Sequence, residues 1–209
     1  MNLDHVEGLV RQELEAKHAA REAALLQSRT LVRTCANAIR AVHRQEWEKA
    51  RGLLDEARAS CLALRQALQD HPDLYYAGYV QDAEKEYVEA SVTYATVRGE
   101  RLPTPADLGV SAAVYLNGLG EAVGELRRYL LDRLRLDELV EGEVLLSHMD
   151  DIYSLLVTVD YPDALTGGLR RTTDTVRSIL EKTRGDLTLA VRQRRLQAAL
   201  ARLEGRLGP

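Results

Sequence analysis

The sequence predicts an all-α protein, an elongated bundle of about six helices. Three observations favour this fold class. Hydrophobic residues make up 45% of the 209 residues and are mostly leucine, alanine and valine. Glycine and proline are sparse, with 14 and 5 residues. Apolar residues recur at steps of three and four along most of the chain, and nothing has the character of a strand. We expect one helical domain over residues 1–209.

The first two predicted helices span residues 3–44 and Glu46–Gln69. A helix of about 40 residues is roughly 60 Å long, more than one compact domain of this size can cover, so we expect contacts with partner subunits. The apolar face of the first helix is predicted at Leu25, Val32, Ala36, Ile39 and Val42. The inward face of the second is predicted at Ala50, Leu53, Leu54, Ala57, Cys61, Leu64 and Leu68.

Four more helices are predicted, over residues 74–97, 110–136, 138–157 and from 165 or 169 to 207. The prolines at 103 and 105 mark a linker after the third helix. Gly118, Gly120 and Gly124 lie inside the fourth helix, where each costs about 1 kcal/mol relative to alanine, so we interpret them as sites of close helix packing. The core stripe of the fifth is predicted at Leu145, Met149, Ile152 and Leu156.

Charge and cysteine content bound the cellular context and the partners. The net charge is −4, but residues 165–209 carry ten basic and four acidic side chains. This basic segment suggests a polyanionic partner, although a solvated basic helix would have the same composition. Cys35 and Cys61 fall on apolar helix faces and are expected to be reduced core residues of a cytoplasmic protein. We expect neither a signal peptide nor a membrane-spanning segment.

The tyrosine-rich helix over residues 74–97 carries the most informative acidic residues. Its core stripe is predicted at Tyr76, Val80, Ala83, Tyr87, Ala90 and Tyr94. Asp82, Glu86 and Glu89 form a second stripe beside it. One interpretation is a solvated acidic face on which Lys85 pairs with Glu89. The other is a carboxylate cluster that binds a hard divalent cation, Mg²⁺ or Mn²⁺.

Carboxylates flank the core on two further predicted helices: Glu121 and Glu125 on one, Asp150 and Asp151 on the other. If a bundle brought the three groups together, their repulsion would require a cation or raised pKa values. Metal-assisted phosphodiester cleavage is the reaction most often built in this way. The chain has no glycine-rich phosphate loop, no cysteine pair at zinc spacing and no Gly-x-Ser-x-Gly motif. The acidic pair Glu86-x-x-Glu89 carries no imidazole, unlike the Glu-x-x-His pattern of di-iron bundles, which favours a harder ion than redox iron.

Several segments together resemble the translin/TRAX family over most of the chain. They are Ser28 to Arg44, Glu86-Tyr87-Val88-Glu89-Ala90, Tyr115-Leu116-x-Gly118 with Gly124-Glu125-Leu126-x-Arg128, His148 to Tyr153, Tyr161 to Thr166 with Arg170-Arg171, and Glu181 to Asp186. The resemblance implies a translin-like subunit of about seven helices, so six to seven in all. It also implies a hollow oligomer, usually an octamer, that encloses single-stranded nucleic acid.

The resemblance to TRAX-like subunits further implies a Mg²⁺-dependent endoribonuclease. The matching catalytic and metal-binding residues are Glu86, Glu89 and Asp151. Glu125 is a further candidate ligand, or else the partner of an arginine that fixes helix packing. Single-stranded RNA is the expected partner, with single-stranded DNA or short duplex RNA as further candidates. The proposed contacts are Arg170, Arg171, Arg177 and Arg184. A translin-like protein that binds without cleaving, and a purely structural helical protein, remain alternatives.

Overall fold

The computed structural model describes residues 3–207, and this part of the chain is helical without a strand. The six long helices are α1 (Asp4–His43), α2 (Trp47–Ala67), α4 (Gly78–Arg98), α6 (Ala112–Leu134), α7 (Leu139–Thr158) and α9 (Leu169–Leu207). Three four-residue helices lie between them: α3 (Pro72–Tyr75), α5 (Pro105–Leu108) and α8 (Asp163–Thr166). The all-α prediction is confirmed. The domain predicted over 1–209 includes two residues at each end that lie outside the described part.

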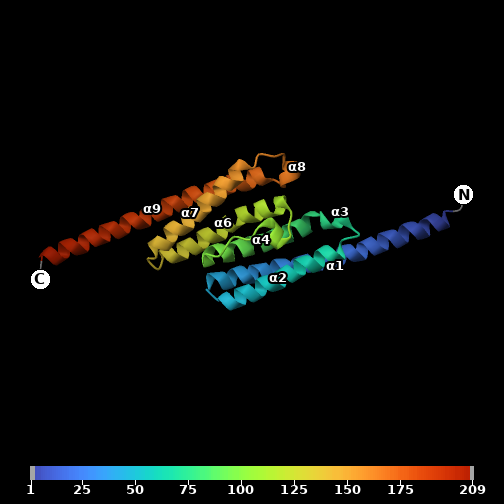
Figure 1. The fold of residues 1–209 in the computed structure, drawn as a ribbon, viewed down its shortest axis with the longest axis horizontal. Helices are drawn as coiled ribbons and strands as arrows, with labels where there is room; N and C mark the ends of the chain where they lie inside the picture. The colour runs from blue at the N-terminus through green and yellow to red at the C-terminus, as the bar shows by residue number, and fades with distance from the viewer. Residues whose placement is uncertain (1–2, 208–209) are drawn as a thin grey trace.

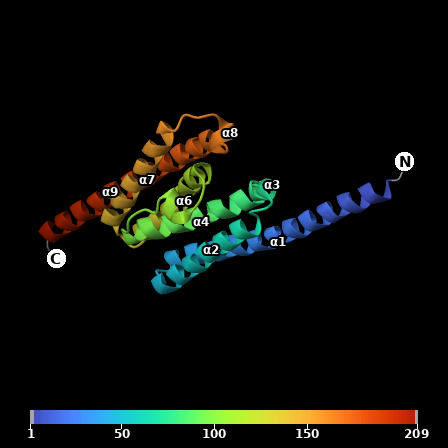
Figure 2. The same cartoon turned by 45° about the vertical axis from the view of Figure 1, so that its right-hand side comes forward.

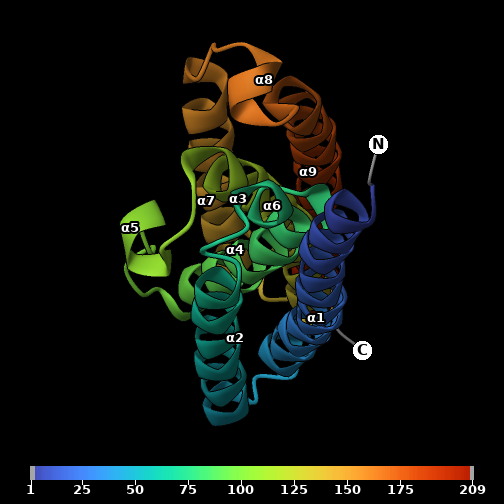
Figure 3. The same cartoon turned by 90° about the vertical axis from the view of Figure 1, so that its right-hand side faces the viewer.

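The long helices pack as three layers of two. The first layer is α1 with α2, the middle layer is α4 with α6, and the third is α7 with α9, as the view along the long axis shows (Figure 3). The start of α1 and the end of α9 project beyond the bundle at opposite ends (Figures 1 and 2). The elongated shape and the single long first helix are therefore as predicted.

The middle layer has neighbours on both sides, and its burial follows from that position. Helix α4 buries residues around its whole circumference, from Val80 to Thr96, rather than along one stripe. Among them are polar side chains, including Glu84, which is 0% exposed and accepts hydrogen bonds from Tyr75 and Arg65. A helix in this position buries acidic side chains that would be solvated on an outer helix.

The predicted core faces hold for α2 and α7 and need correction elsewhere. In α1 the fully buried line is Ala24, Ser28, Leu31, Cys35, Ala38, Ile39 and Val42, so the predicted Leu25, Val32 and Ala36 lie at its edge. Tyr76 was predicted in the core but is 69% exposed, because it ends α3 before α4 begins at Gly78. The last long helix starts at Leu169, after the separate short helix α8.

Cys35 and Cys61 are buried free thiols in the main core, as expected. Within residues 3–207, no helix combines the length and the hydropathy needed to cross a bilayer.

Candidate metal centre

Helices α4 and α6 carry the site, and local signals fix where each begins and ends. Helix α4 ends at Gly99, whose φ of 66° is left-handed, a conformation that glycine adopts without strain. Helix α6 begins after Ser111, whose hydroxyl accepts a hydrogen bond of 3.3 Å from the Val114 amide. The connection between the two helices, residues 99–111, includes α5, which begins with a capping box between Thr104 and Asp107. These caps define the end of α4 and the start of α6, and the two helices pack against each other.

Two glycines allow α6 to approach its neighbours closely. A Cβ atom at Gly118 would lie 2.7 Å from the Val88 Cβ and 2.8 Å from the Lys85 carbonyl oxygen, both on α4. A Cβ atom at Gly120 would collide with the Thr172 methyl group on α9. The predicted role in close packing is therefore confirmed at these two positions. It is wrong for Gly124, where an added Cβ would meet nothing within 4 Å.

This close packing brings three carboxylates together. Glu86 and Glu89 on α4 and Glu121 on α6 each offer an oxygen atom, and these three atoms lie within 4.8 Å of one another. All three side chains are half-buried. Oxygen ligands at about 2.1 Å from one Mg²⁺ ion are separated by roughly 3–4 Å, so small side-chain rotations would bring the three into the range of one ion.

Burial and mutual repulsion alter the acidity of the cluster. Burial, followed by the charges of Glu86, Glu121 and Glu125, raises the pKa of Glu89 to about 8. Burial and the Glu121 charge also raise the pKa of Glu86. Without a cation, Glu89 therefore keeps a proton at neutral pH, which relieves part of the repulsion.

Lys85 compensates part of the negative charge, although with other partners than expected. Its ammonium group lies 3.0 Å from a Glu121 oxygen and 3.4 Å from an Asp82 oxygen. Helix α4 does not form the Lys85–Glu89 pair of the solvated-face interpretation. Only Asp82 of the predicted acidic stripe is exposed, while Glu86 and Glu89 are half-buried.

Glu125 lies one turn beyond Glu121 and is held by another helix. Its Oε2 atom lies 2.5 Å from Nε2 of His43 on α1 and 3.6 Å from an Arg128 guanidinium nitrogen. The hydrogen bond from His43 lowers the pKa of Glu125, so this carboxylate stays ionised. Glu125 thus acts on the cluster by its charge, from outside the group of three, and its closest partner is a histidine rather than an arginine.

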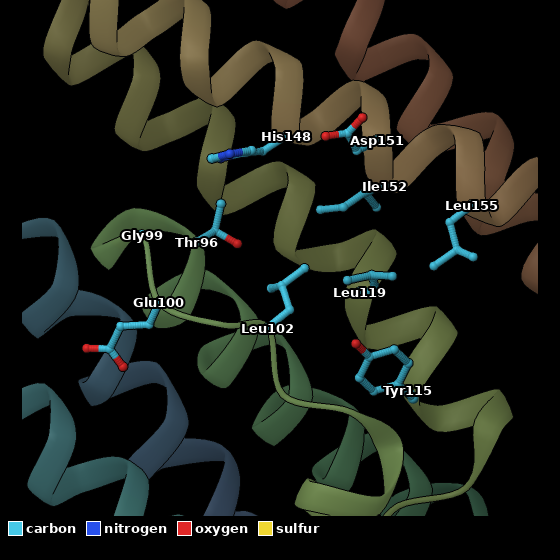
Figure 4. Close-up of a pocket in the computed structure, with 10 residues that line it drawn as sticks. All are labelled: Thr96, Gly99, Glu100, Leu102, Tyr115, Leu119, His148, Asp151, Ile152 and Leu155. Carbon is cyan, nitrogen blue, oxygen red and sulfur yellow. The ribbon is translucent and has the colours of Figure 1, made fainter.

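Asp151 is exposed and lies at a different cavity. This second cavity, of about 370 Å³, is lined by residues from the end of α4, the following loop, α6 and α7 (Figure 4). Leu119 of α6 lines it, whereas Glu121, two residues further on, lines the cavity of the acidic cluster. Two residues correspond to about 200° around a helix, so the two cavities open on opposite sides of α6. The predicted convergence of Asp151 with Glu86 and Glu89 is not found within the chain, and Glu121 lies there instead.

The four predicted RNA-binding arginines separate into two groups. Arg171 lines the same cavity of about 650 Å³ as the three glutamates. The other three contact residues of α7 or of the loop that follows it. Arg170 lies 3.8 Å from Asp160, Arg177 donates to the Tyr153 hydroxyl and Arg184 lies 3.2 Å from Asp150.

Known proteins resemble the chain over almost its whole length, although no family model matches it. The uncharacterised protein MJ0175 of Methanocaldococcus jannaschii is 32% identical over 193 residues, which cover 91% of this chain and 85% of that protein. AfC3PO, a translin-family protein of Archaeoglobus, was solved as a complex with duplex RNA. It is 34% identical, with a TM-score of 0.82, over 90% of this chain and 97% of that one.

Two further solved structures have the same fold. A crystal structure of AfC3PO gives a TM-score of 0.81 at 33% identity, covering 94% of this chain and 98% of that one. The crystal structure of apo-NeC3PO, from Nematostella, gives 0.81 at 21% identity over 91% and 99% of the two chains. The likeness to NeC3PO concerns the fold alone.

Proposed function

The chain belongs to the translin/TRAX family, and from this membership and the acidic cavity we propose that it is a Mg²⁺-dependent endoribonuclease acting on single-stranded RNA. The observation that carries the proposal is the convergence of Glu86, Glu89 and Glu121 in one half-buried cavity. The site joins two helices whose close packing depends on Gly118, so the cluster is a product of the fold rather than of local sequence.

The donor set suits a hard divalent cation. All three groups are carboxylates, and oxygen ligands without imidazole or thiolate favour Mg²⁺ or Mn²⁺. A cation would also take over the role of the proton that Glu89 retains, because metal binding requires the deprotonated ligand. When bound, Mg²⁺ would supply charge stabilisation at the phosphate and lower the pKa of the attacking water.

The side chains of the cluster would have two roles, ion binding and proton transfer. Glu86, Glu89 and Glu121 would hold the ion, and one of these carboxylates would accept a proton from the attacking water. The water oxygen forms a bond to phosphorus while one phosphorus–oxygen ester bond breaks. The departing oxygen receives a proton from solvent, so the products are one phosphate end and one hydroxyl end.

RNA as the ligand is supported by AfC3PO, which was solved with duplex RNA. Short duplex RNA and single-stranded DNA are therefore further ligands to test. We also propose a homo-octamer in the cytoplasm. The exposed parts of α1 and α9 each carry uncovered apolar residues, which fits burial against further subunits. They are Val6, Leu9, Val10 and Leu14 on α1, and Leu196, Leu200 and Leu203 on α9.

The test is a cleavage assay on the purified chain with end-labelled single-stranded RNA, with Mg²⁺ and with a chelator. We expect cleavage with Mg²⁺ only, and none by Glu86→Gln, which retains the shape but not the charge of the ligand. Light scattering on the same samples measures the assembly and controls for folding. Metal-independent cleavage, or an active Glu86→Gln, would contradict the nuclease. RNA binding without cleavage would support the binding-only alternative.

A further inference from the structure

We propose that Arg171 binds the phosphate group of the RNA at the acidic cavity, whose lining it shares with the three glutamates. This inference rests on the proposed function, because it names the residue that holds the substrate against the carboxylates. The other three arginines predicted to contact RNA do not line this cavity.

The cavity itself places Arg171 in reach of a substrate. Its lining comes from three helices: the carboxylates and Lys85 from α4 and α6, and Arg171, Thr175 and Ile179 from α9. The volume of about 650 Å³ leaves room for a nucleotide between the two walls. A phosphodiester lying there would meet both the carboxylates and the guanidinium group of the lining.

The charges in the lining distinguish Arg171 from Lys85. Lys85 is engaged by Glu121 and Asp82, at 3.0 and 3.4 Å. The Arg171 side chain is exposed, and within residues 3–207 its guanidinium group makes no hydrogen bond or ion pair. An arginine that stays unpaired beside three carboxylates keeps all of its donors available. A guanidinium group can give two parallel hydrogen bonds to a phosphate, which a lysine cannot.

A buried network fixes the backbone of α9 beside Arg171 relative to the turn of α6 that carries Glu121. The next residue, Thr172, donates a hydrogen bond of 2.6 Å to the Asn117 side chain on α6. The Asn117 amide nitrogen in turn donates to the Thr166 carbonyl oxygen, at 2.8 Å, and the Asn117 side chain is buried. The contact between Thr172 and Gly120 completes this junction. The start of α9 is thus fixed on the turn of α6 that leads into Glu121.

This arrangement matches the charge that phosphodiester cleavage develops. Attack on phosphorus increases the negative charge on the non-bridging oxygens, and a preorganised cation beside them stabilises the transition state more than the ground state. Metal-holding carboxylates alone cannot supply that contact, because they repel the phosphate. Arg171 would therefore contribute to both RNA affinity and turnover.

The experiment compares Arg171→Ala with Arg192→Ala, a control that removes the same charge from an exposed position of α9 outside the cavity lining. RNA affinity is measured by fluorescence anisotropy, with Ca²⁺ replacing Mg²⁺ to prevent turnover, over a series of salt concentrations. We expect Arg171→Ala to bind about tenfold more weakly and to lower the slope of log affinity against log salt by about 0.7, as for the loss of one phosphate contact to a single strand. Arg171→Lys should recover part of the affinity. Arg192→Ala should stay within about twofold of the parent.

Two further measurements separate a local effect from misfolding and from failure of the proposed function. Mn²⁺ binding without RNA, followed by electron paramagnetic resonance, should be at least as tight in Arg171→Ala as in the parent, because a positive charge has been removed. If Arg171→Ala matches Arg192→Ala in affinity, salt slope and cleavage, the role of Arg171 is overturned while the nuclease stands. If the parent binds RNA without cleaving it, the nuclease fails, and the affinity and slope still decide on Arg171. A parent that binds no RNA overturns both.

Discussion

The two cavities beside α6 contain similar residue types and differ in what the fold does with them. The cavity toward α4 and α9 gathers three half-buried carboxylates and has a pKa of about 8 at Glu89. The cavity toward α7 has two exposed carboxylates, Asp151 and Glu100, among leucines, an isoleucine and a tyrosine, and Glu100 is paired with Arg51 and Arg98 (Figure 4). An acidic residue beside an apolar stripe is therefore not enough to make a metal site. Convergence requires two helices to approach at those positions, and Gly118 provides that approach.

The largest expected difference between the cavities is in catalysis. Glu121→Gln removes a charge from the cluster and should lower the cleavage rate by about 100-fold or more, as does loss of other groups that stabilise developing charge. Asp151→Asn removes the same charge from the other side of α6 and should stay within about twofold of the parent. Single-turnover cleavage of labelled RNA measures both. Equal losses in the two variants would mean that the assignment of Glu121 is mistaken.

A pair of glycine variants tests the packing that separates the cavities. Gly118→Ala puts a methyl group against Val88 and the Lys85 carbonyl oxygen, so it should cost about 1–3 kcal/mol of unfolding free energy and weaken Mn²⁺ binding. Gly124→Ala meets open space and should stabilise the chain, by up to about 1 kcal/mol, through helix propensity. Urea denaturation gives both values. A Gly118→Ala protein with parental stability and metal affinity would refute the close approach.

A smaller effect is expected in the pH dependence of the metal-free protein. The pKa of Glu89 is about 8 in the folded chain against an ordinary value of 4.5. Between these values the folded state binds more protons than the unfolded state, so the free energy of unfolding should fall as pH rises through this range. We expect the parent Tm to drop by several degrees from pH 6 to pH 8.5 in chelator.

Two variants, one in each cavity, test whether Glu89 causes this pH effect. Glu89→Gln should lose much of the drop, because it cannot release the proton, while Asp151→Asn should keep it. Calorimetric scans at the two pH values measure these shifts. If Glu89→Gln loses as much Tm as the parent, Glu89 is not the group that holds the proton.

Most of the fold could be predicted because the apolar periodicity that marks each long helix is local. The stripes of α2 and α7 were correctly identified for this reason. The short helices α3, α5 and α8 are not predicted from the sequence, because four residues are too few to show a helical period. The prediction for Tyr76 was wrong because its spacing from Val80 fits the apolar period of α4, whereas Tyr76 lies in the turn between α3 and α4 and is exposed.

The candidate site could be predicted only in part, and the reason is geometric. Glu86 and Glu89 share one helix, so their spacing alone places them side by side. The third carboxylate depends on how α6 and α7 are rotated against α4, and sequence spacing does not report that angle. The resemblance to TRAX pointed to Asp151. The signal for Glu121 was available in Gly118 and Gly120, because close-packing glycines mark the face of α6 that touches other helices.

The most direct test of the central claim is to locate a bound cation. A crystal of the protein soaked in Mn²⁺ and measured by anomalous diffraction would place the ion independently of activity. We predict a peak bounded by Glu86, Glu89 and Glu121, on the side of α6 that faces α4. A peak beside Asp151 instead, or none at millimolar Mn²⁺, would contradict the account.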